Sequence, residues 1–170
     1  MNRKVLTSII ILVIIVGVFA YLNAGDVEDR ALSQKEAILF LNYQGEEVAE
    51  IDFDSIQELK EDQFQETLRS SDSPDQENTY TGVLLKDILA KYDIPVDGFS
   101  QVVTKAADGY TVALGQAEVL EDDNIYVVYM INGEYLASKS EGGSGPYQIV
   151  IRNDQFGQRW NKFLMELNVN

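Results

Sequence analysis

The chain has 170 residues, a formal net charge of −15 and 45% hydrophobic residues. This length and apolar content suit one globular domain plus an accessory segment. The absence of cysteine and histidine excludes disulfides, Ser–His and Cys–His nucleophiles and the usual zinc ligands. The negative charge argues against a nucleic-acid partner, because phosphate binding needs a basic face.

The N-terminal segment is the most apolar part of the chain. Residues 5–22 carry no charge, and Arg3 and Lys4 precede them. As a helix they would span about 27 Å, close to a hydrocarbon core, and the flanking cations would mark the cytoplasmic side. We expect residues 1–24 to be a signal anchor, a transmembrane helix that holds a single-pass protein in the cell membrane with its domain on the extracytoplasmic side. A cleaved signal peptide is the alternative and gives a secreted protein.

The next segments alternate between polar connections and short regular elements. Residues 25–35 are polar and are expected to be a tether. Residues 36–53 predict two strands around a turn at Gln44-Gly45, and Asp54 or Ser55 can cap a short helix after them. Residues 69–79 are rich in Ser, Asp and Pro and predict a loop.

The central part of the chain predicts one longer helix. Residues 80–95 place apolar side chains on one helical face, with Thr81 as a cap and Pro95 as the end. Residues 100–115 predict a hairpin, because Asp108-Gly109 separates two alternating runs. Residues 116–124 predict a single helical turn.

The C-terminal part predicts three strands. The unbroken apolar run at residues 125–131 is typical of a strand covered on both faces, and Asn132-Gly133 predicts a turn. Residues 146–152 and 163–169 predict the other two strands. Strands and helices do not alternate regularly, so residues 36–170 are expected to form one strand-rich domain of mixed α+β class.

One window departs from the acidic background. Residues 139–170 contain four cations against three acids, and glycines at 142, 143 and 145 precede the strand at 146–152. Arginine, lysine and glycine amides can together bind an anionic group. The other interpretation is that these cations only balance neighbouring acids.

Five segments of the chain, in order and spacing, resemble the oxidoreductase molybdopterin-binding domain of the sulfite oxidase family. They are residues 82–85, 108–110, 132–136, 145–146 and 156–163. The resemblance covers roughly residues 80–170. It implies the sulfite oxidase fold for the domain, and it implies that Arg159 lies near a pterin phosphate.

The resemblance and the cationic window together give a set of predicted cofactor- or anion-binding residues. They are Gly145, Gln148, Arg152, Arg159 and Lys162. The chain also departs from the family. That family holds molybdenum through a cysteine thiolate and contacts the cofactor through histidines, and this chain has neither. Ser70 and Ser71 lie roughly where the cysteine would precede the helix, and Gln148 replaces an arginine of the family.

These observations predict an anchored extracytoplasmic domain that lacks molybdenum redox activity and binds an anionic small molecule or a protein partner. No catalytic residue, metal ligand or bound cofactor is predicted, and molybdopterin is the one cofactor that the resemblance implies. The alternative is a molybdopterin-dependent oxidoreductase that retains the cofactor without a cysteine ligand. A third hypothesis is a structural or interaction protein whose cations only balance charge.

Overall fold

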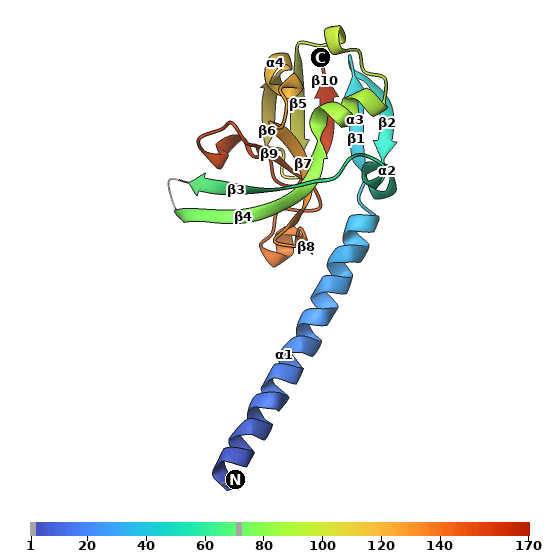
Figure 1. Ribbon diagram of the computed structural model, residues 1–170. Coiled ribbons are helices and arrows are strands. Elements are labelled where there is room, and N and C mark those ends of the chain that lie inside the picture. The colour runs from blue at the N-terminus through green and yellow to red at the C-terminus, as the bar shows by residue number, and fades with distance from the viewer. Residues whose placement is uncertain (1–2, 71–72) are drawn as a thin grey trace.

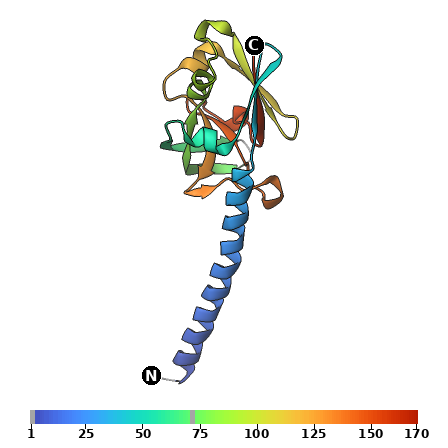
Figure 2. The same ribbon diagram turned by 90° about the vertical axis from the view of Figure 1, so that its right-hand side faces the viewer.

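The structure is a computed structural model that describes residues 3–70 and 73–170, with the side chains of residues 5–18, 28–69 and 74–170. Its domain contains two five-stranded sheets and a few short helices, from which the long helix α1 (Arg3–Lys35) extends (Figures 1 and 2). The predicted strand-rich α+β class is confirmed.

Helix α1 is longer than the sequence suggested. It continues without a break through residues 25–35, which were expected to be a tether, and its last turn packs against the domain, where Gln34 is 1% exposed. The apolar side chains between Val5 and Val18 are exposed. Among the residues that the structure describes, no helix meets the length and hydropathy that a membrane span needs.

The first sheet has the strand order β2-β1-β10-β5-β6. Its two hairpins turn at Gln44-Gly45 and Asp108-Gly109, as predicted, and both glycines have positive φ. The C-terminal strand pairs in parallel with β1 and antiparallel with β5, so the two ends of the domain sequence meet at its centre. The strands are β1 (Leu39–Tyr43), β2 (Glu46–Ile51), β5 (Gln101–Ala106), β6 (Thr111–Gly115) and β10 (Leu164–Val169).

The second sheet has the order β3-β4-β7-β8, and β9 also pairs with β7. Its strands are β3 (Asp62–Ser70), β4 (Ser73–Leu84), β7 (Ile125–Ile131), β8 (Glu134–Tyr135) and β9 (Gln148–Ile151). The run at residues 125–131 is a strand with its first five residues buried, and Asn132-Gly133 turns the chain, as predicted.

The loop expected at residues 69–79 is wrong for most of this segment. Residues 73–79 belong to β4 and pair with β3, for example Glu77 with Thr67. Backbone pairing with a preceding strand decides the conformation here, and the polar side chains of this hairpin give no apolar alternation by which the sequence could reveal it. The turn itself, at residues 71–72, lies outside the described residues.

The helices are shorter than expected, because the sheets take some of their residues. Residues 80–84 pair with β7, so the helix predicted from Thr81 begins only after Leu84. The helix after β2 is capped by the Asp52 side chain, which accepts a hydrogen bond from the Ser55 amide, and Asp54 lies inside it. The helices are α2 (Phe53–Gln57), α3 (Leu85–Lys91), α4 (Gln116–Leu120), and the 3-10 turns η1 (Val96–Gly98), η2 (Lys139–Glu141) and η3 (Gly157–Arg159).

The close approach of β4 to β7 depends on a glycine. A Cβ added at Gly82 would lie 2.7 Å from the Val128 Cα atom and would also overlap the Val127 carbonyl. These backbone atoms of β7 cannot move without disturbing the register between β4 and β7. Gly82 therefore permits the backbone of β4 to lie close against that of β7.

We predict that Gly82→Ala lowers the free energy of unfolding by about 1–3 kcal/mol, the usual cost of forcing atoms into a packed interior. Gly115→Ala is the control, since its Cβ would meet only a glutamate oxygen at 3.8 Å. It should cost less than Gly82→Ala, because it involves no overlap and only places a less favoured residue at the N-cap of α4. Chemical denaturation measures both. Equal effects of the two substitutions would contradict the assignment.

Candidate binding pocket

A cavity of about 230 Å³ lies between the β3–β4 hairpin, the β7–β8 turn and the loop before β9. Figure 1 shows the hairpin extending from the body between β8 and the loop that follows β9. Residues far apart in the sequence meet in this cavity. Those that carry the argument below are Arg30, Asn78, Tyr80, Ser144, Gln148 and Lys162.

Gln148 gives the pocket a buried amide. Its residue is 3% exposed, it lines the cavity, and it sits in β9 opposite Val128 of β7. Its side chain forms no hydrogen bond to any residue that the structure describes. Its amide atoms are not among the fully buried polar atoms that lack a partner. They are therefore open to the cavity, where the amide can donate to and accept from a polar ligand.

Lys162 gives the pocket a cation. It lines the same cavity and has no ion pair within the described part of the chain. Its neighbours are fixed: the Trp160 indole NH donates to the Ile151 carbonyl over 3.1 Å, and the Asn161 amide donates to the Thr104 hydroxyl over 2.9 Å. The backbone segment that carries the Lys162 ammonium is therefore held in place by these two hydrogen bonds.

The remaining polar groups of the wall come mainly from β4 and the glycine-rich loop. Tyr80 is 1% exposed, and burial raises the pKa of its hydroxyl, so it is a neutral phenol at physiological pH. Its ring meets that of Trp160 edge to face, with 5.7 Å between centroids. The Asn78 side-chain oxygen is already engaged, because it accepts a hydrogen bond from the Asn132 side-chain amide over 2.8 Å. The wall thus offers amide and hydroxyl groups around Lys162.

Helix α1 supplies a second cation at the rim. The Arg30 guanidinium donates from Nη1 to Glu134 and from Nε to Glu141, both over 3.0 Å. Hydrogen bonds from Ser138, and then the Arg30 contact, lower the pKa of Glu141 to about 2. The carboxylate is therefore charged at any physiological pH, and Arg30 stays tied to the η2 turn.

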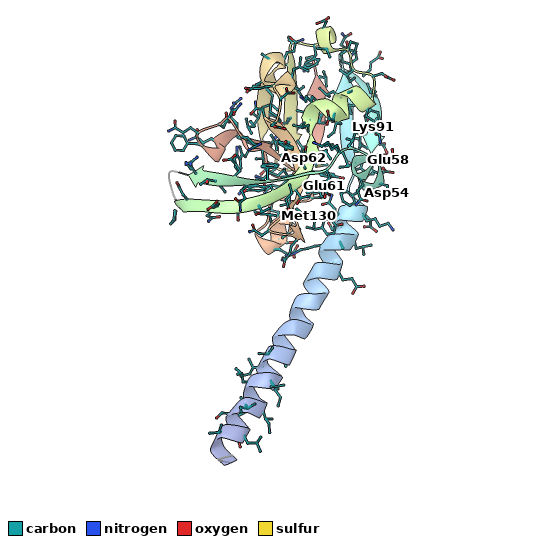
Figure 3. All side chains as sticks on the ribbon, viewed as in Figure 1. Asp54, Glu58, Glu61, Asp62, Lys91 and Met130 are labelled. Carbon is teal, nitrogen blue, oxygen red and sulfur yellow. The ribbon has the colours of Figure 1, made fainter. Side chains whose placement is uncertain are left out.

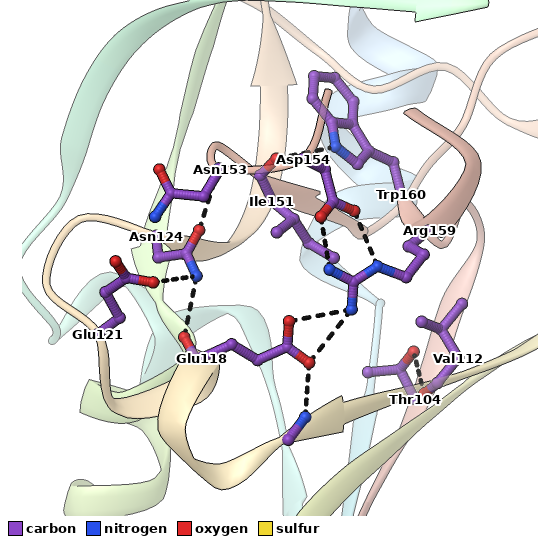
Figure 4. A network of polar contacts seen from close by, with 11 residues as sticks. Thr104, Val112, Glu118, Glu121, Asn124, Ile151, Asn153, Asp154, Arg159 and Trp160 are labelled. Atoms are coloured by element: carbon purple, nitrogen blue, oxygen red, sulfur yellow. Dashed lines mark hydrogen bonds and ion pairs between the residues drawn. The ribbon is translucent and has the colours of Figure 1, made fainter. Parts of the chain in front are cut away.

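Arg159 lies in a different place, with its charge already matched (Figure 4). It donates to Asp154 over 2.9 Å from Nε and 2.5 Å from Nη2, and Nη1 donates to both oxygens of Glu118, at 3.0 and 3.2 Å. The Asp154 contact is the main cause that raises the pKa of Arg159. Two carboxylates on one guanidinium leave little capacity for another anion.

Arg152 is also engaged. Its guanidinium lies over the Phe64 ring, 5.1 Å from the centroid, its Nε is 3.6 Å from a Glu66 oxygen, and Nη1 donates to the Asp123 carbonyl over 3.4 Å. These contacts hold Arg152 against the β3 strand. It does not line the cavity that contains Gln148 and Lys162.

Gly145 has a packing position beside the pocket. A Cβ there would overlap the Leu136 carbonyl and lie 2.9 Å from its carbon, and the Gly145 amide donates to Ala137 over 2.8 Å. Gly145 therefore lets the loop before β9 lie against the segment after β8. That contact closes one wall of the cavity.

The structure brings together two of the five sequence-predicted site residues, Gln148 and Lys162, with Gly145 next to them. Arg152 and Arg159 lie outside the cavity. Sequence reasoning missed Arg30, Tyr80 and Asn78. Arg30 lay in the segment expected to be a tether, and Asn78 in the segment expected to be a loop, so no local pattern indicated either.

Some of the clustered acids elsewhere have partners of their own. Near α2 and α3, Glu58 pairs with Lys91 at 2.6 Å (Figure 3). The Tyr129 hydroxyl donates to Glu61. Across the described ranges, no group of three or more acidic side chains is placed to hold a metal ion.

Comparison with family profiles identifies the chain. Residues 56–170 match the oxidoreductase molybdopterin binding domain. The chain belongs to this family. The resemblance seen in the sequence is confirmed, and the match starts earlier than residue 80, so that it includes the β3–β4 hairpin.

A solved structure has the same fold. The sulfane dehydrogenase SoxCD from Paracoccus pantotrophus superposes with a TM-score of 0.64 at 15% identity, over 81% of this chain and 39% of that chain. The present chain thus spans about two fifths of that longer one. A comparison with curated proteins found no match.

The residues present do not fit the molybdenum of the family's cofactor. The chain has no thiolate or imidazole to hold the metal, and carboxylate, amide and hydroxyl groups are poor substitutes for a thiolate at a soft metal. The 230 Å³ cavity is also smaller than the roughly 300–1,000 Å³ of sites for drug-sized ligands. Arg159, predicted to lie near a pterin phosphate, and Arg152, predicted to bind the cofactor or an anion, both have carboxylate neighbours.

We predict that Arg159 and Asp154 stabilise the fold as a pair. Their double-mutant cycle, with Arg159→Ala and Asp154→Ala, should give a coupling of about 0.5–1 kcal/mol, since the contact is bidentate but the Arg159 side chain is 40% exposed. Denaturation of the four proteins measures it. Additive effects would mean that the contact contributes no stability.

Proposed function

We propose that the chain is a member of the molybdopterin-binding family that works as a non-redox binding module for a small organic anion. The observation that supports this most is that one cavity is lined both by the Gln148 amide, which is open to it, and by Lys162, which has no ion pair among the described residues. A charged group on the ligand would meet Lys162, and its hydrogen-bonding groups would meet the amides and hydroxyls of the wall.

The ligand class follows from the composition of the wall. Lys162 is the cation available to a ligand, because Arg30 is paired with both Glu134 and Glu141. Glu134 is the one carboxylate among the residues that line the cavity. Ser144 and Tyr80 add hydroxyl groups, and apolar side chains such as Leu68, Ile131 and Leu136 form the rest of the wall. An anion rich in hydroxyl groups and about as large as a sugar phosphate fits these contacts better than an apolar ligand does.

The second candidate is a molybdopterin-dependent oxidoreductase that retains its cofactor without a cysteine ligand. Membership of the family favours it. The donor set of this chain disfavours it, because no thiolate or imidazole is present to hold the metal. The two candidates differ in cofactor content, which can be measured directly.

We also propose that residues 1–24 hold the domain on the extracytoplasmic side of the cell membrane, or direct its secretion if they are cleaved. The uncharged run at residues 5–22 behind Arg3 and Lys4 supports this. A surface position would place the pocket where it meets external solutes or a protein partner.

For the pocket, we predict that glucose 6-phosphate binds the full chain and that Lys162→Ala weakens binding at least about tenfold, because a charge-assisted hydrogen bond is lost. Gln148→Met, which keeps the volume, should also weaken it. Lys60→Ala is the control, since Lys60 pairs with Asp62 and does not line the cavity. Calorimetry gives the affinities, and glucose and inorganic phosphate report the separate parts of the ligand. Equal affinities of the Lys162 and Lys60 variants, or no binding below about 10 mM, would refute the pocket.

For the cofactor, we predict less than about one tenth of a molybdenum atom and of a pterin per chain after production in cells that make the molybdenum cofactor, because no thiolate is present to hold the metal. Elemental mass spectrometry and fluorescence of the oxidised pterin measure the two. Stoichiometric molybdenum and pterin together would replace the binding module with the oxidoreductase.

For the membrane, we predict that the chain stays in the membrane fraction after alkaline carbonate extraction and that protease added to intact spheroplasts digests the domain. An uncharged helix in the bilayer resists extraction, unlike a peripheral contact. Intact mass distinguishes the anchored chain from a cleaved, secreted one. A full-length chain found entirely in the cytoplasm would overturn both forms.

A further inference from the structure

Helix α1 forms part of the pocket as well as the N-terminal extension. Arg30 lines the cavity, and its two ion pairs reach Glu134 at the β7–β8 turn and Glu141 in η2. The segments that carry these two glutamates are themselves walls of the cavity. The last turns of α1 therefore link the segment of Glu134 to the segment of Glu141 through Arg30.

One turn later, α1 is buried beside the residue that precedes the pocket amide. Gln34 is 1% exposed, and its side chain lies beside the hydroxyl of Tyr147, which is fully buried. Tyr147 directly precedes Gln148 in the chain. A shift of the helix end would thus disturb the backbone from which Gln148 enters the cavity.

From these contacts we propose that the C-terminal turns of α1, residues 28–35, are a docking wall of the pocket, so that ligand binding and helix docking stabilise each other. The inference rests on the proposed binding function and concerns its regulation. If the ligand binds only when the wall is in place, linkage requires that the ligand strengthen docking by the same factor. The orientation of the domain on its helix then reports whether the pocket is filled.

Gln34→Ala separates docking from ligand contact. Gln34 packs in the helix–domain contact without a hydrogen bond and does not line the cavity. Its truncation leaves a gap in that contact, which loosens docking without removing a group that touches the ligand. Leu32→Ala is the matched control on the same helix, because Leu32 is 55% exposed. Arg30→Met removes the ion pairs and the rim cation together.

The absence of native cysteine allows docking to be measured with two introduced ones. Spin labels at Glu28→Cys on α1 and Gln101→Cys on β5 give a distance distribution by pulsed electron resonance on the full chain in detergent micelles. We expect a narrow distribution for the parent, a broader one for the Gln34→Ala and Arg30→Met variants, and narrowing of both by saturating glucose 6-phosphate.

Affinity for glucose 6-phosphate should fall about five- to tenfold in Gln34→Ala and stay within twofold in Leu32→Ala. If the parent binds and the Gln34→Ala variant binds with the same affinity although its distance distribution has broadened, the coupling is overturned. The pocket itself would remain supported. An unbroadened distribution would also overturn it, because the wall would not depend on this contact. Absence of parent binding would instead refute the proposed function itself.

Discussion

The second sheet is organised around β7, a strand buried for most of its length that pairs with three others. Tyr80 of β4 lies opposite Ile131, Tyr135 of β8 opposite Met130, and Gln148 of β9 opposite Val128. Hydrogen-bond register along one strand thus brings to the same end of the sheet three segments that are distant in the sequence. The cavity exists where these segments meet, and its polar wall is a consequence of that register.

Electrostatics then separates two kinds of cation in a chain of net charge −15. Arg159 and Arg152 have carboxylate neighbours at short range, so their charges are balanced within the fold. Lys162, three residues from Arg159, has none among the described residues and faces the cavity. A cation without a partner in so acidic a protein favours binding of an external anion, because the surroundings supply many carboxylates that could have paired with it.

Much of the fold could be predicted from local chemistry. The hairpin at Asp108-Gly109 and the turn at Asn132-Gly133 follow from residues that tolerate positive φ, and the apolar run of β7 reveals a strand covered on both faces. The β3–β4 hairpin could not be predicted, because its outer half is polar and is held by pairing alone. The sequence also could not distinguish Lys162 from Arg159, since only the tertiary placement of Asp154 and Glu118 makes the difference.

The central claim is that the anion site lies at Gln148 and Lys162 and not at Arg159. Amide and guanidinium NH signals in a ¹⁵N–¹H correlation spectrum of the full chain, recorded during titration with glucose 6-phosphate, test it most directly. The account predicts that the Gln148 side-chain NH₂ pair and the Lys162 backbone amide shift, while the Arg159 Nε–H stays in place. Shifts that cluster at Arg159, Asp154 and Glu118, with Gln148 unmoved, would contradict it.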